Sequence, residues 1–315
     1  MVRRRPARKL PLQGIRGTPG FRPAVATPAR GPYDARMLER FETLADGLDH
    51  PEGITIGPDG RVYAGGEAGQ IYRIGPGGEV EPLGDTGGFL YGVTLDGNGR
   101  VYGCDMGRQE IVRLDPSTGD VDSYSRGTFT NHLRVPNFAA FDDVGNLYAT
   151  DSGEWGADDG LVFRIAPGGE TSVWTDTPRR FPNGCCLSAE GDALLVVESR
   201  ARRVVRIPIA GDGSARGAET LADLTGSQPD GIALDAEGAM YVGCYRPDRI
   251  WRIDPLGKIE VLAEDPDGVV LNQPANVIFA GEGLGRLAVS SLGGWSLVWA
   301  DVGAVGLPLR YPEIA

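Results

Sequence analysis

The chain has 315 residues, of which 41% are hydrophobic and 23% are charged, a composition typical of a globular protein rather than a disordered one. It contains 48 glycines and 23 prolines without a three-residue period, which excludes a collagen-like structure and predicts many tight turns. No apolar run approaches the roughly 20 residues that cross a bilayer, so the sequence predicts no membrane span. Four irregularly spaced cysteines are too few for a disulfide scaffold and fit a reducing compartment at least as well.

Charge is divided unevenly along the chain. Residues 1–30 contain eight Lys and Arg residues and no acid, and because the net charge is −12, the rest of the chain carries −20. An acidic body argues against nucleic-acid binding, which needs a basic face, although the basic segment itself could contact nucleic acid or an anionic membrane. That segment has five prolines and lacks both an apolar period and the apolar core of a secretory signal. We therefore predict a flexible, uncleaved basic tail over residues 1–38 of a cytoplasmic protein.

A sequence phrase recurs six times after this tail. The six units begin at Pro51, Leu90, Pro136, Pro182, Pro229 and Pro274, 39 to 47 residues apart. Each unit contains three short strand-like runs separated by Gly, Asp or Asn turns, as in PDGIALDAEGAMYVGCY…IWRI, and a fourth run such as KIEVLA (258–263) follows. Four strands and a period in the forties are typical of a propeller blade. The sequence thus predicts an all-β, six-bladed propeller with four-stranded blades over residues 39–315.

The two ends of the repeat array complement each other. The sixth unit stops after its third strand, while RFETLADGL (40–48) precedes the first unit and resembles AETLADL (218–224), the fourth strand of the fourth unit. A strand from residues 40–48 that completes the last blade would close the ring and remove its exposed edges.

One position of the phrase supplies oxygen donors. The first strand of each blade lines the central channel, so the second position of every unit points toward a common axis. That position holds Glu52, Tyr91, Asn137, Asn183, Asp230 and Ala275, with Asn276 one step further on. Two carboxylates and two carboxamides suit a hard divalent cation, most of all Ca²⁺, with Mg²⁺, Mn²⁺, Zn²⁺ or Fe²⁺ as alternatives. The competing interpretation is that Pro-Asn-Gly and Pro-Asp-Gly are simply turns, but ordinary turns such as Asp59-Gly60 fall later in each unit.

Several phrases resemble a known family. HPEG, VPN…NLYATD, FPNGCCLSAEG and QPDGIALDAEGAMYVGCY resemble the gluconolactonase and senescence-marker-protein family, and are similar to diisopropylfluorophosphatase and drug-responsive lactonase, over roughly residues 40–305. The resemblance implies a six-bladed propeller with a channel Ca²⁺ that hydrolyses lactones or, in some relatives, phosphoesters. The family's metal positions match Glu52, Asn137, Asn183 and Asp230. The aspartate matching Asp230 is implied to act in catalysis as well as in metal binding.

The chain departs from that family where substrates are recognised. Members that act on sugar lactones carry an arginine and an asparagine in the second blade, and this chain has Phe89 and Tyr91 in the matching stretch. Many relatives have Asn-Asp where this chain has Asn137-Phe138. An aromatic wall from Phe89, Tyr91 and Phe138 predicts a small-molecule substrate less polar than a sugar lactone.

Two further residues are pocket candidates. His132, five residues before Asn137, could be a general base at the channel mouth, although we favour a surface-loop histidine. Asp151 could line the pocket or support a second ion, and a turn acid is equally consistent. The sequence has no Gly-x-Ser-x-Gly, phosphate loop or His-Glu-x-x-His, which excludes serine hydrolase, NTPase and zincin chemistry by those routes.

Together these patterns predict a metal-dependent hydrolase of lactones or related esters. The cation would polarise the carbonyl, and Asp230 would act as base or nucleophile. Two alternatives remain, because fold alone does not decide function. One is a non-catalytic ligand- or protein-binding propeller with a structural ion, and the other is a natural-product enzyme that uses the same site for a non-hydrolytic step.

Overall fold

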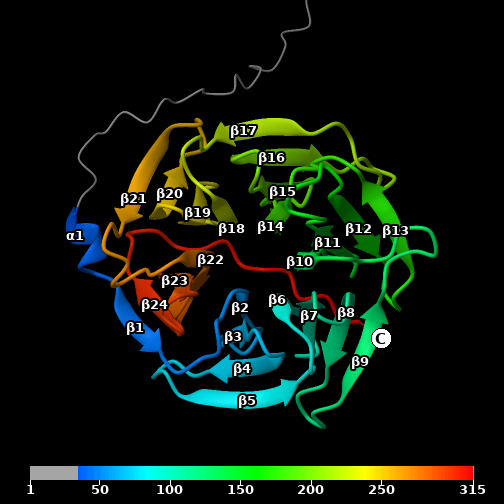
Figure 1. The fold of residues 1–315 in the computed structure, drawn as a ribbon, viewed down its shortest axis with the longest axis horizontal. Helices are drawn as coiled ribbons and strands as arrows, with labels where there is room; N and C mark the ends of the chain where they lie inside the picture. The colour runs from blue at the N-terminus through cyan, green and yellow to red at the C-terminus, as the bar shows by residue number, and fades with distance from the viewer. Residues whose placement is uncertain (1–34, 315) are drawn as a thin grey trace, which may run out of the picture.

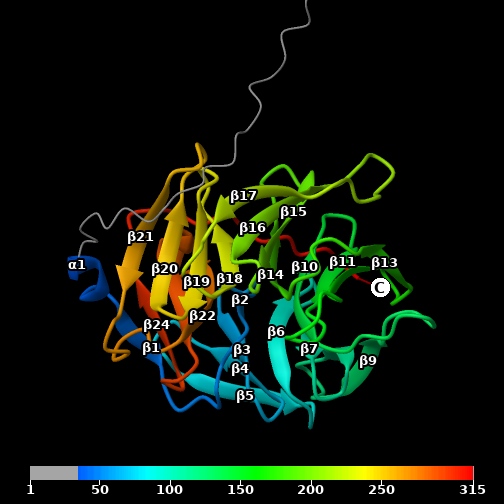
Figure 2. The ribbon, with the colours of Figure 1, turned by 45° about the horizontal axis from the view of Figure 1, so that its top comes forward.

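The computed structural model describes residues 35–314, which form six four-stranded antiparallel sheets around a central axis (Figure 1, Figure 2). The predicted six-bladed propeller is confirmed. Blade 1 consists of β2 (Ile54–Ile56), β3 (Val62–Gly65), β4 (Gln70–Ile74) and β5 (Val80–Asp85). Blade 2 consists of β6 (Leu90–Leu95), β7 (Val101–Asp105), β8 (Glu110–Leu114) and β9 (Val121–Ser125). Blade 3 consists of β10 (Pro136–Phe141), β11 (Leu147–Asp151), β12 (Leu161–Ile165) and β13 (Thr171–Thr175). Blades 4 and 5 consist of β14 (Pro182–Leu187), β15 (Ala193–Glu198), β16 (Arg203–Pro208) and β17 (Glu219–Asp223); and β18 (Pro229–Leu234), β19 (Met240–Tyr245), β20 (Asp248–Ile253) and β21 (Ile259–Glu264).

Blade 6 joins the two ends of the described chain. Its strands are β22 (Pro274–Ala280), β23 (Arg286–Ser291), β24 (Ser296–Ala300) and β1 (Glu42–Ala45), with the 3₁₀ turn η1 (Glu282–Leu284) between β22 and β23. β1 pairs antiparallel with β24, with Glu42 opposite Trp299. The carboxylate of Glu42 also accepts a hydrogen bond from the Trp299 indole and pairs with Arg286. The predicted closure by residues 40–48 is therefore confirmed.

A tyrosine–aspartate contact repeats from blade to blade and explains part of the recurring phrase. In three blades the tyrosine of the second strand donates to an aspartate of the preceding turn. The pairs are Tyr63–Asp59, Tyr102–Asp96 and Tyr241–Asp235, at 3.0, 3.0 and 3.1 Å. In blade 5 the other oxygen of Asp235 accepts the backbone N–H groups of Glu237 and Ala239, which fixes the turn. Blades 1, 2 and 5 are thus held together at this hairpin as well as along their strands.

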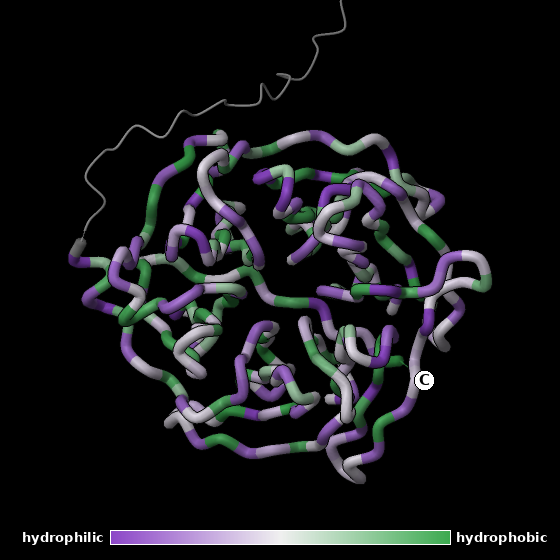
Figure 3. The backbone as a smooth tube through the Cα atoms, viewed as in Figure 1, coloured by the Kyte–Doolittle hydropathy of each residue, from purple (hydrophilic) through white to green (hydrophobic). Residues whose placement is uncertain are grey.

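A C-terminal strap, residues 301–314, crosses the central channel at the end where the first strands finish (Figure 1). The Leu307 N–H donates to the carbonyl of Leu234, and the Tyr311 hydroxyl donates to the carbonyl of Ile56. Hydrophobic residues of the strap lie over the centre of the ring (Figure 3). A cavity of about 70 Å³, lined by residues such as Ile54, Ile232 and Leu307, lies between the first strands and the strap. The strap therefore covers one end of the channel.

The N-terminal boundary differs slightly from the expected one. α1 (Ala35–Leu38) forms a single helical turn, and its Met37 and Leu38 pack against the core that blades 5 and 6 share. The rest of the predicted tail, residues 1–34, lies outside the described residues and stays a prediction. None of the helices in residues 35–314 is long and apolar enough to cross a membrane.

Candidate metal and catalytic site

The predicted oxygen donors lie at matching places on neighbouring inner strands. Asn137, Asn183 and Asp230 are the second residues of β10, β14 and β18, and Glu52 lies two residues before β2. The three strand residues are only 2%, 3% and 4% exposed. The Pro-Asn-Gly and Pro-Asp-Gly stretches belong to strands, so the competing turn interpretation is wrong for them.

Gly53 and Gly231, which follow Glu52 and Asp230, allow the inner strands of neighbouring blades to approach each other closely. A Cβ on Gly231 would lie 2.2 Å from Oδ1 of Asn276 in the next blade, and a Cβ on Gly53 would lie 2.0 Å from the carbonyl oxygen of Tyr91. A side chain at either position would therefore push the blades apart. Glycine lets the strands converge, which draws the preceding carboxylates toward the axis.

Two acids, Glu52 and Asp230, share this end of the channel. Burial raises the pKa of Glu52 well above its usual value, and the charges of Asp230 and Glu67 raise it further. Burial likewise raises the pKa of Asp230 to about 7, against the opposing effect of the neighbouring Asn183 carboxamide. Like charges with little solvent resist ionisation, and a bound cation would relieve this repulsion.

Unsatisfied oxygen atoms point to the same conclusion. Oδ1 of Asn183, Asp230 and Asn276 are each buried without a hydrogen-bond partner. A buried polar atom without a partner is unfavourable by about 1–3 kcal/mol, so three in one place need an explanation. Within residues 35–314 no group of three His, Cys, Asp or Glu side chains could hold a metal, so any cation here needs amide oxygens. The residues fit a hard cation, which Glu52, Asn137, Asn183 and Asp230 would hold with Asn276 nearby.

Two hydroxyl groups hold the backbone of candidate ligands across blade boundaries. Thr150 accepts the N–H of Phe138 at 3.1 Å and donates to the carbonyl of Asn183 at 2.8 Å. Ser290 accepts the N–H of Asn276 at 2.8 Å and donates to the carbonyl of Glu52 at 2.7 Å. Each hydroxyl occupies the second-to-last residue of a second strand and links its own first strand to the next blade. Sequence reasoning missed both residues, since a single Ser or Thr in a strand carries no distinctive signal.

The rings of Phe89 and Tyr91 lie together, and Tyr91 is close enough to Glu52 and Asp230 to feel their charges, while their role as a pocket wall stays a prediction. Their rings are 5.2 Å apart in an edge-to-face arrangement. Burial and then the charges of Glu52, Asp230 and Glu67 raise the pKa of Tyr91, so the phenol stays protonated beside the acids. A protonated phenol can donate a hydrogen bond to a substrate oxygen.

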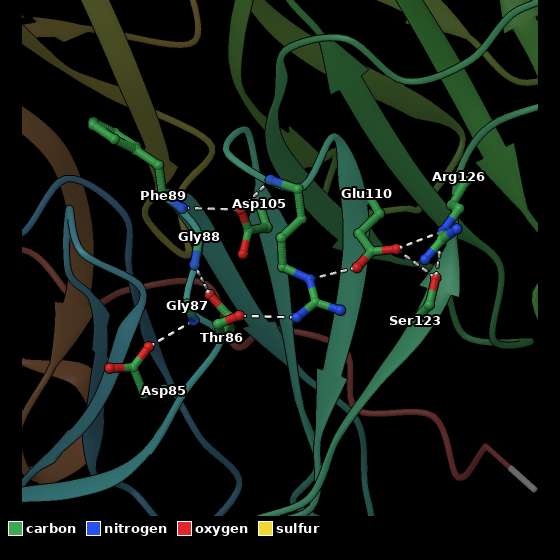
Figure 4. A network of polar contacts seen from close by, with 10 residues as sticks. Asp85, Thr86, Gly87, Gly88, Phe89, Asp105, Glu110, Ser123 and Arg126 are labelled. Atoms are coloured by element: carbon green, nitrogen blue, oxygen red, sulfur yellow. Dashed lines mark hydrogen bonds and ion pairs between the residues drawn. The ribbon is translucent and has the colours of Figure 1, made fainter.

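A polar network fixes the loop that carries Phe89 (Figure 4). The Phe89 N–H and the Arg108 N–H both donate to Oδ1 of Asp105, each at 2.9 Å. The Arg108 guanidinium donates to the carbonyl of Thr86 and to Glu110. Ser123 and Arg126 bind the other carboxylate oxygen of Glu110. The Phe89 ring extends away from this network in Figure 4, on a backbone that is held in place.

Of three further pocket candidates, Phe138 and Asp151 have surroundings different from those expected. Phe138 is 9% exposed and packs in the core between blades 3 and 4, where it also lines the cavity beneath the strap. Asp151 is 1% exposed, and its carboxylate accepts the N–H groups of Arg134, Val135 and Gly153, so it anchors a loop instead of lining a pocket. His132 is exposed in a short hairpin bridged to Gly127, in agreement with the favoured surface-loop interpretation.

Sequence reasoning also missed a cluster above Glu52. Nδ1 of His50 lies 3.0 Å from a carboxylate oxygen of Glu67, and its Nε2 accepts a hydrogen bond from the Trp295 indole at 3.0 Å. The His50 and Trp295 rings are 4.7 Å apart. Tyr245 also belongs to this region, because burial and then the charges of Asp230 and Glu52 raise its pKa. His50 and Trp295 are 245 residues apart, so no local pattern could have paired them.

The comparisons with known proteins agree with this architecture. A strictosidine synthase-like protein of Arabidopsis thaliana is 28% identical over 163 residues, 47% of this chain and 41% of that protein. A lactonase of Staphylococcus saprophyticus is 25% identical over 186 residues, 55% of this chain and 57% of that protein. This chain thus matches only about half the length of these curated relatives. The solved structure of regucalcin from Agrobacterium tumefaciens, described as a calcium-binding protein, superposes with a TM-score of 0.71 at 18% identity, covering 87% of this chain and 96% of the other.

Two family models match different parts of the chain. Residues 36–74 match the strictosidine synthase-like N-terminal model. Residues 92–293, well over half of the chain, match the SMP-30/gluconolactonase/LRE-like region model. The chain therefore belongs to the SMP-30/gluconolactonase/LRE-like family.

Proposed function

We propose that this propeller is a divalent-cation-dependent hydrolase of lactones or related esters. The proposal rests on the buried, unpartnered oxygens of Asn183, Asp230 and Asn276. A second acid, Glu52, lies close enough to Asp230 for their charges to repel. Such a set is unfavourable without a cation and is the donor set that Ca²⁺ prefers. Family membership and the lactonase of Staphylococcus saprophyticus support lactone chemistry at the same site. The calcium-binding regucalcin supports Ca²⁺ as the ion.

The chemistry divides between the cation and the residues around it. When bound, a divalent cation supplies Lewis acidity that polarises the scissile carbonyl and stabilises the oxyanion. Asp230, a buried carboxylate at the axis, accepts the proton of the attacking water. Glu52, Asn137 and Asn183, together with Asp230, would hold the cation. Tyr91, held protonated by its surroundings, orients the substrate by donating from its hydroxyl.

The walls of the site set the substrate class. Phe89 and Tyr91 present two aromatic rings beside the donor set, in the blade where sugar recognition would need polar groups. Aromatic walls favour apolar contact over hydroxyl recognition. The substrate in this proposal is therefore an ester or lactone less polar than a sugar lactone.

A panel of lactones and aryl esters, assayed after chelation and after adding back each divalent cation, tests this function. We expect hydrolysis to disappear with the chelator and to return with Ca²⁺, with alkyl- or aryl-substituted lactones hydrolysed faster than gluconolactone. Calorimetric Ca²⁺ titration of the chelated protein, read alongside, checks the cation site separately. Ca²⁺ binding without turnover of any panel member would overturn the hydrolase and leave a structural ion.

A second candidate is a natural-product enzyme that joins or rearranges its substrates at the same site. The matches of residues 36–74 and of the Arabidopsis thaliana protein to strictosidine synthase-like sequences favour it. Mass spectrometry of the products separates the two candidates, since hydrolysis adds one water to the substrate and a joining reaction does not.

A further inference from the structure

We propose that three consecutive blades form a rigid apolar arc at the channel mouth that binds the alkyl or aryl substituent of the substrate. The arc consists of Phe89, Val135 and Phe181, with Trp155 packed behind its last member. This inference rests on the proposed function, because Val135 and Phe181 each lie two residues before a candidate cation ligand, Asn137 and Asn183, and Phe89 lies two residues before Tyr91. It names the part of the substrate that the ligands do not contact.

The arc belongs to a second ring of residues above the donor ring. The six members each directly precede the first residue of a repeat unit: His50, Phe89, Val135, Phe181, Gln228 and Gln273. Equivalent backbone contacts show that four of them occupy the same place in their blades. The carbonyls of Phe89, Val135, Phe181 and Gln273 accept the N–H groups of Met106, Ser152, Ser199 and Leu292, at 2.8, 2.9, 3.0 and 3.2 Å. Gln273 is exposed and the other five are half-buried, so all six remain in part accessible to solvent.

The second ring is divided into two halves. Blades 2, 3 and 4 contribute Phe89, Val135 and Phe181, and the other three blades contribute a histidine and two glutamines. An apolar half that is continuous over three blades is a wall for an apolar group, since the hydrophobic effect scales with the area it can cover. The polar half leaves hydrogen-bonding groups on the opposite side, near Glu52 and Glu67. A substrate that is polar at one end and apolar at the other would be oriented by this division.

Buried carboxylates hold the loops of the apolar half. The last residues of the second strands in blades 2, 3 and 4 are Asp105, Asp151 and Glu198, which are 0%, 1% and 1% exposed. Asp105 accepts the N–H of Phe89 at 2.9 Å, and Asp151 accepts the N–H of Val135 at 3.1 Å. Glu198 accepts the N–H of Arg180, the residue before Phe181, at 2.7 Å.

The corresponding last residues of blades 5 and 6 are Tyr245 and Ser291, and the first blade ends its second strand with Gly65. An acid at this strand position thus occurs in the three blades that carry the arc, while in the polar half the N–H of Gln273 donates to a carboxylate from another place, Asp248, at 2.7 Å. A wall fixed before the ligand arrives needs little ordering when it binds.

Phe181 is the most constrained member of the arc. Its φ is 64°, a left-handed conformation that a bulky residue rarely adopts. Its ring packs edge-to-face on Trp155 at 4.7 Å, and Trp155 remains 45% exposed. Strained residues held by their surroundings gather at functional sites, and here the strain places a large ring at the mouth instead of in the core.

The test is a γ-lactone series with alkyl chains of increasing length, assayed as substrates, with the matching γ-lactams as binding probes. We expect kcat/KM and lactam affinity of the wild-type protein to rise up to about fourfold for each methylene that the arc covers. Phe181→Gly removes the ring yet suits the positive φ, so the protein should fold while the rise becomes much shallower. Trp155→Ala should give an intermediate slope, and Gln228→Ala, in the polar half of the same ring, should keep the wild-type slope.

The two readouts separate failure of the arc from failure of the proposed function. Lactam affinity that rises with chain length and flattens in Phe181→Gly supports the arc even if no lactone is hydrolysed, in which case the hydrolase alone is wrong. Equal slopes in the wild-type protein and Phe181→Gly overturn the arc, whether or not lactones are hydrolysed. A wild-type protein indifferent to chain length in both readouts overturns it as well.

Discussion

The hydroxyl of Thr150 in blade 3 donates a hydrogen bond to the backbone carbonyl of Asn183 in blade 4, across 2.8 Å. Asn183 contributes one of the unpartnered oxygens, so the position of a candidate ligand depends on a side chain of the neighbouring blade. Ser290 holds Glu52 in the same way from blade 6. The donor ring is therefore set by contacts between blades as well as within them.

Replacement of Thr150 by valine tests this dependence. Thr150→Val keeps the shape but leaves the carbonyl of Asn183 and the N–H of Phe138 without their partner. We expect a loss of about 1–3 kcal/mol in the free energy of unfolding, and Ca²⁺ affinity lower by about tenfold or more. Denaturant melts and calorimetric Ca²⁺ titration measure the two effects. Thr43→Val, at an exposed position of β1, is the control, and unchanged Ca²⁺ affinity in Thr150→Val would refute the positioning role.

The assignment of the proton acceptor is tested at Asp230. Asp230→Asn keeps an oxygen and nearly the same shape but cannot accept the proton, so turnover at saturating cation should fall by ~10²–10⁴. Asn183→Asp should retain the cation and lower turnover, because an added charge makes the cation less electrophilic. His132→Ala should change turnover little, given the exposed position of His132. An inactive His132→Ala together with an active Asp230→Asn would reverse the assignment.

The pH dependence of stability is expected to report Glu110. Burial would raise the pKa of this carboxyl, but hydrogen bonds from Ser123, Arg108 and Arg126 outweigh it and lower the pKa below its usual value. A lowered pKa stabilises the folded state above the unfolded-state pKa, near 4.3, and this contribution is lost as the pH falls through the folded-state pKa. Glu110→Gln should therefore melt at a lower temperature than the wild-type protein at pH 7, with a difference that shrinks below about pH 4. A difference independent of pH would mean that shape, not charge, holds this network.

The C-terminal strap is expected to shield the inside of the channel. Cys186 lines the cavity beneath the strap together with Arg310, and burial raises the pKa of its thiol to about 12. Truncation after Asp301 should expose this thiol, so a disulfide reagent at pH 8 should modify the truncated protein much faster than the full chain. Adding Cys186→Ala to the truncated protein should abolish the gain. Equal rates for the full and truncated chains would show that the strap does not close the channel.

Sequence patterns predicted the blades and the matching strand positions of the candidate donors, for a physical reason. Both depend on repetition, since a residue such as Asp230 is recognised by its register with Glu52, Asn137 and Asn183 in the other units. The contacts that orient the site, by contrast, do not repeat in every unit. Thr150 and Ser290 are ordinary strand residues until the neighbouring blade is placed beside them, and the His50–Trp295 pair depends on ring closure.

Asp151 and Phe138 show the opposite limit of sequence reasoning. Their places in the repeat suggested a pocket, but a repeat predicts only the position of a residue in its blade. It does not predict which groups the side chain contacts. The carboxylate of Asp151 accepts hydrogen bonds from the backbone N–H groups of its own loop, and Phe138 packs against the next blade.

The pairing of β1 with β24 has a consequence for the order in which the molecule can be completed. Thr43 lies opposite Val298, so β1 can pair only after the ribosome has made a partner more than 250 residues later in the chain. Ser290, which holds the carbonyl of Glu52, is also made late. A growing chain can form blades 2 to 5 one after another from local contacts. The backbone of Glu52 is held in place only after Ser290 has been made. The ring of blades is therefore complete only once synthesis is nearly finished.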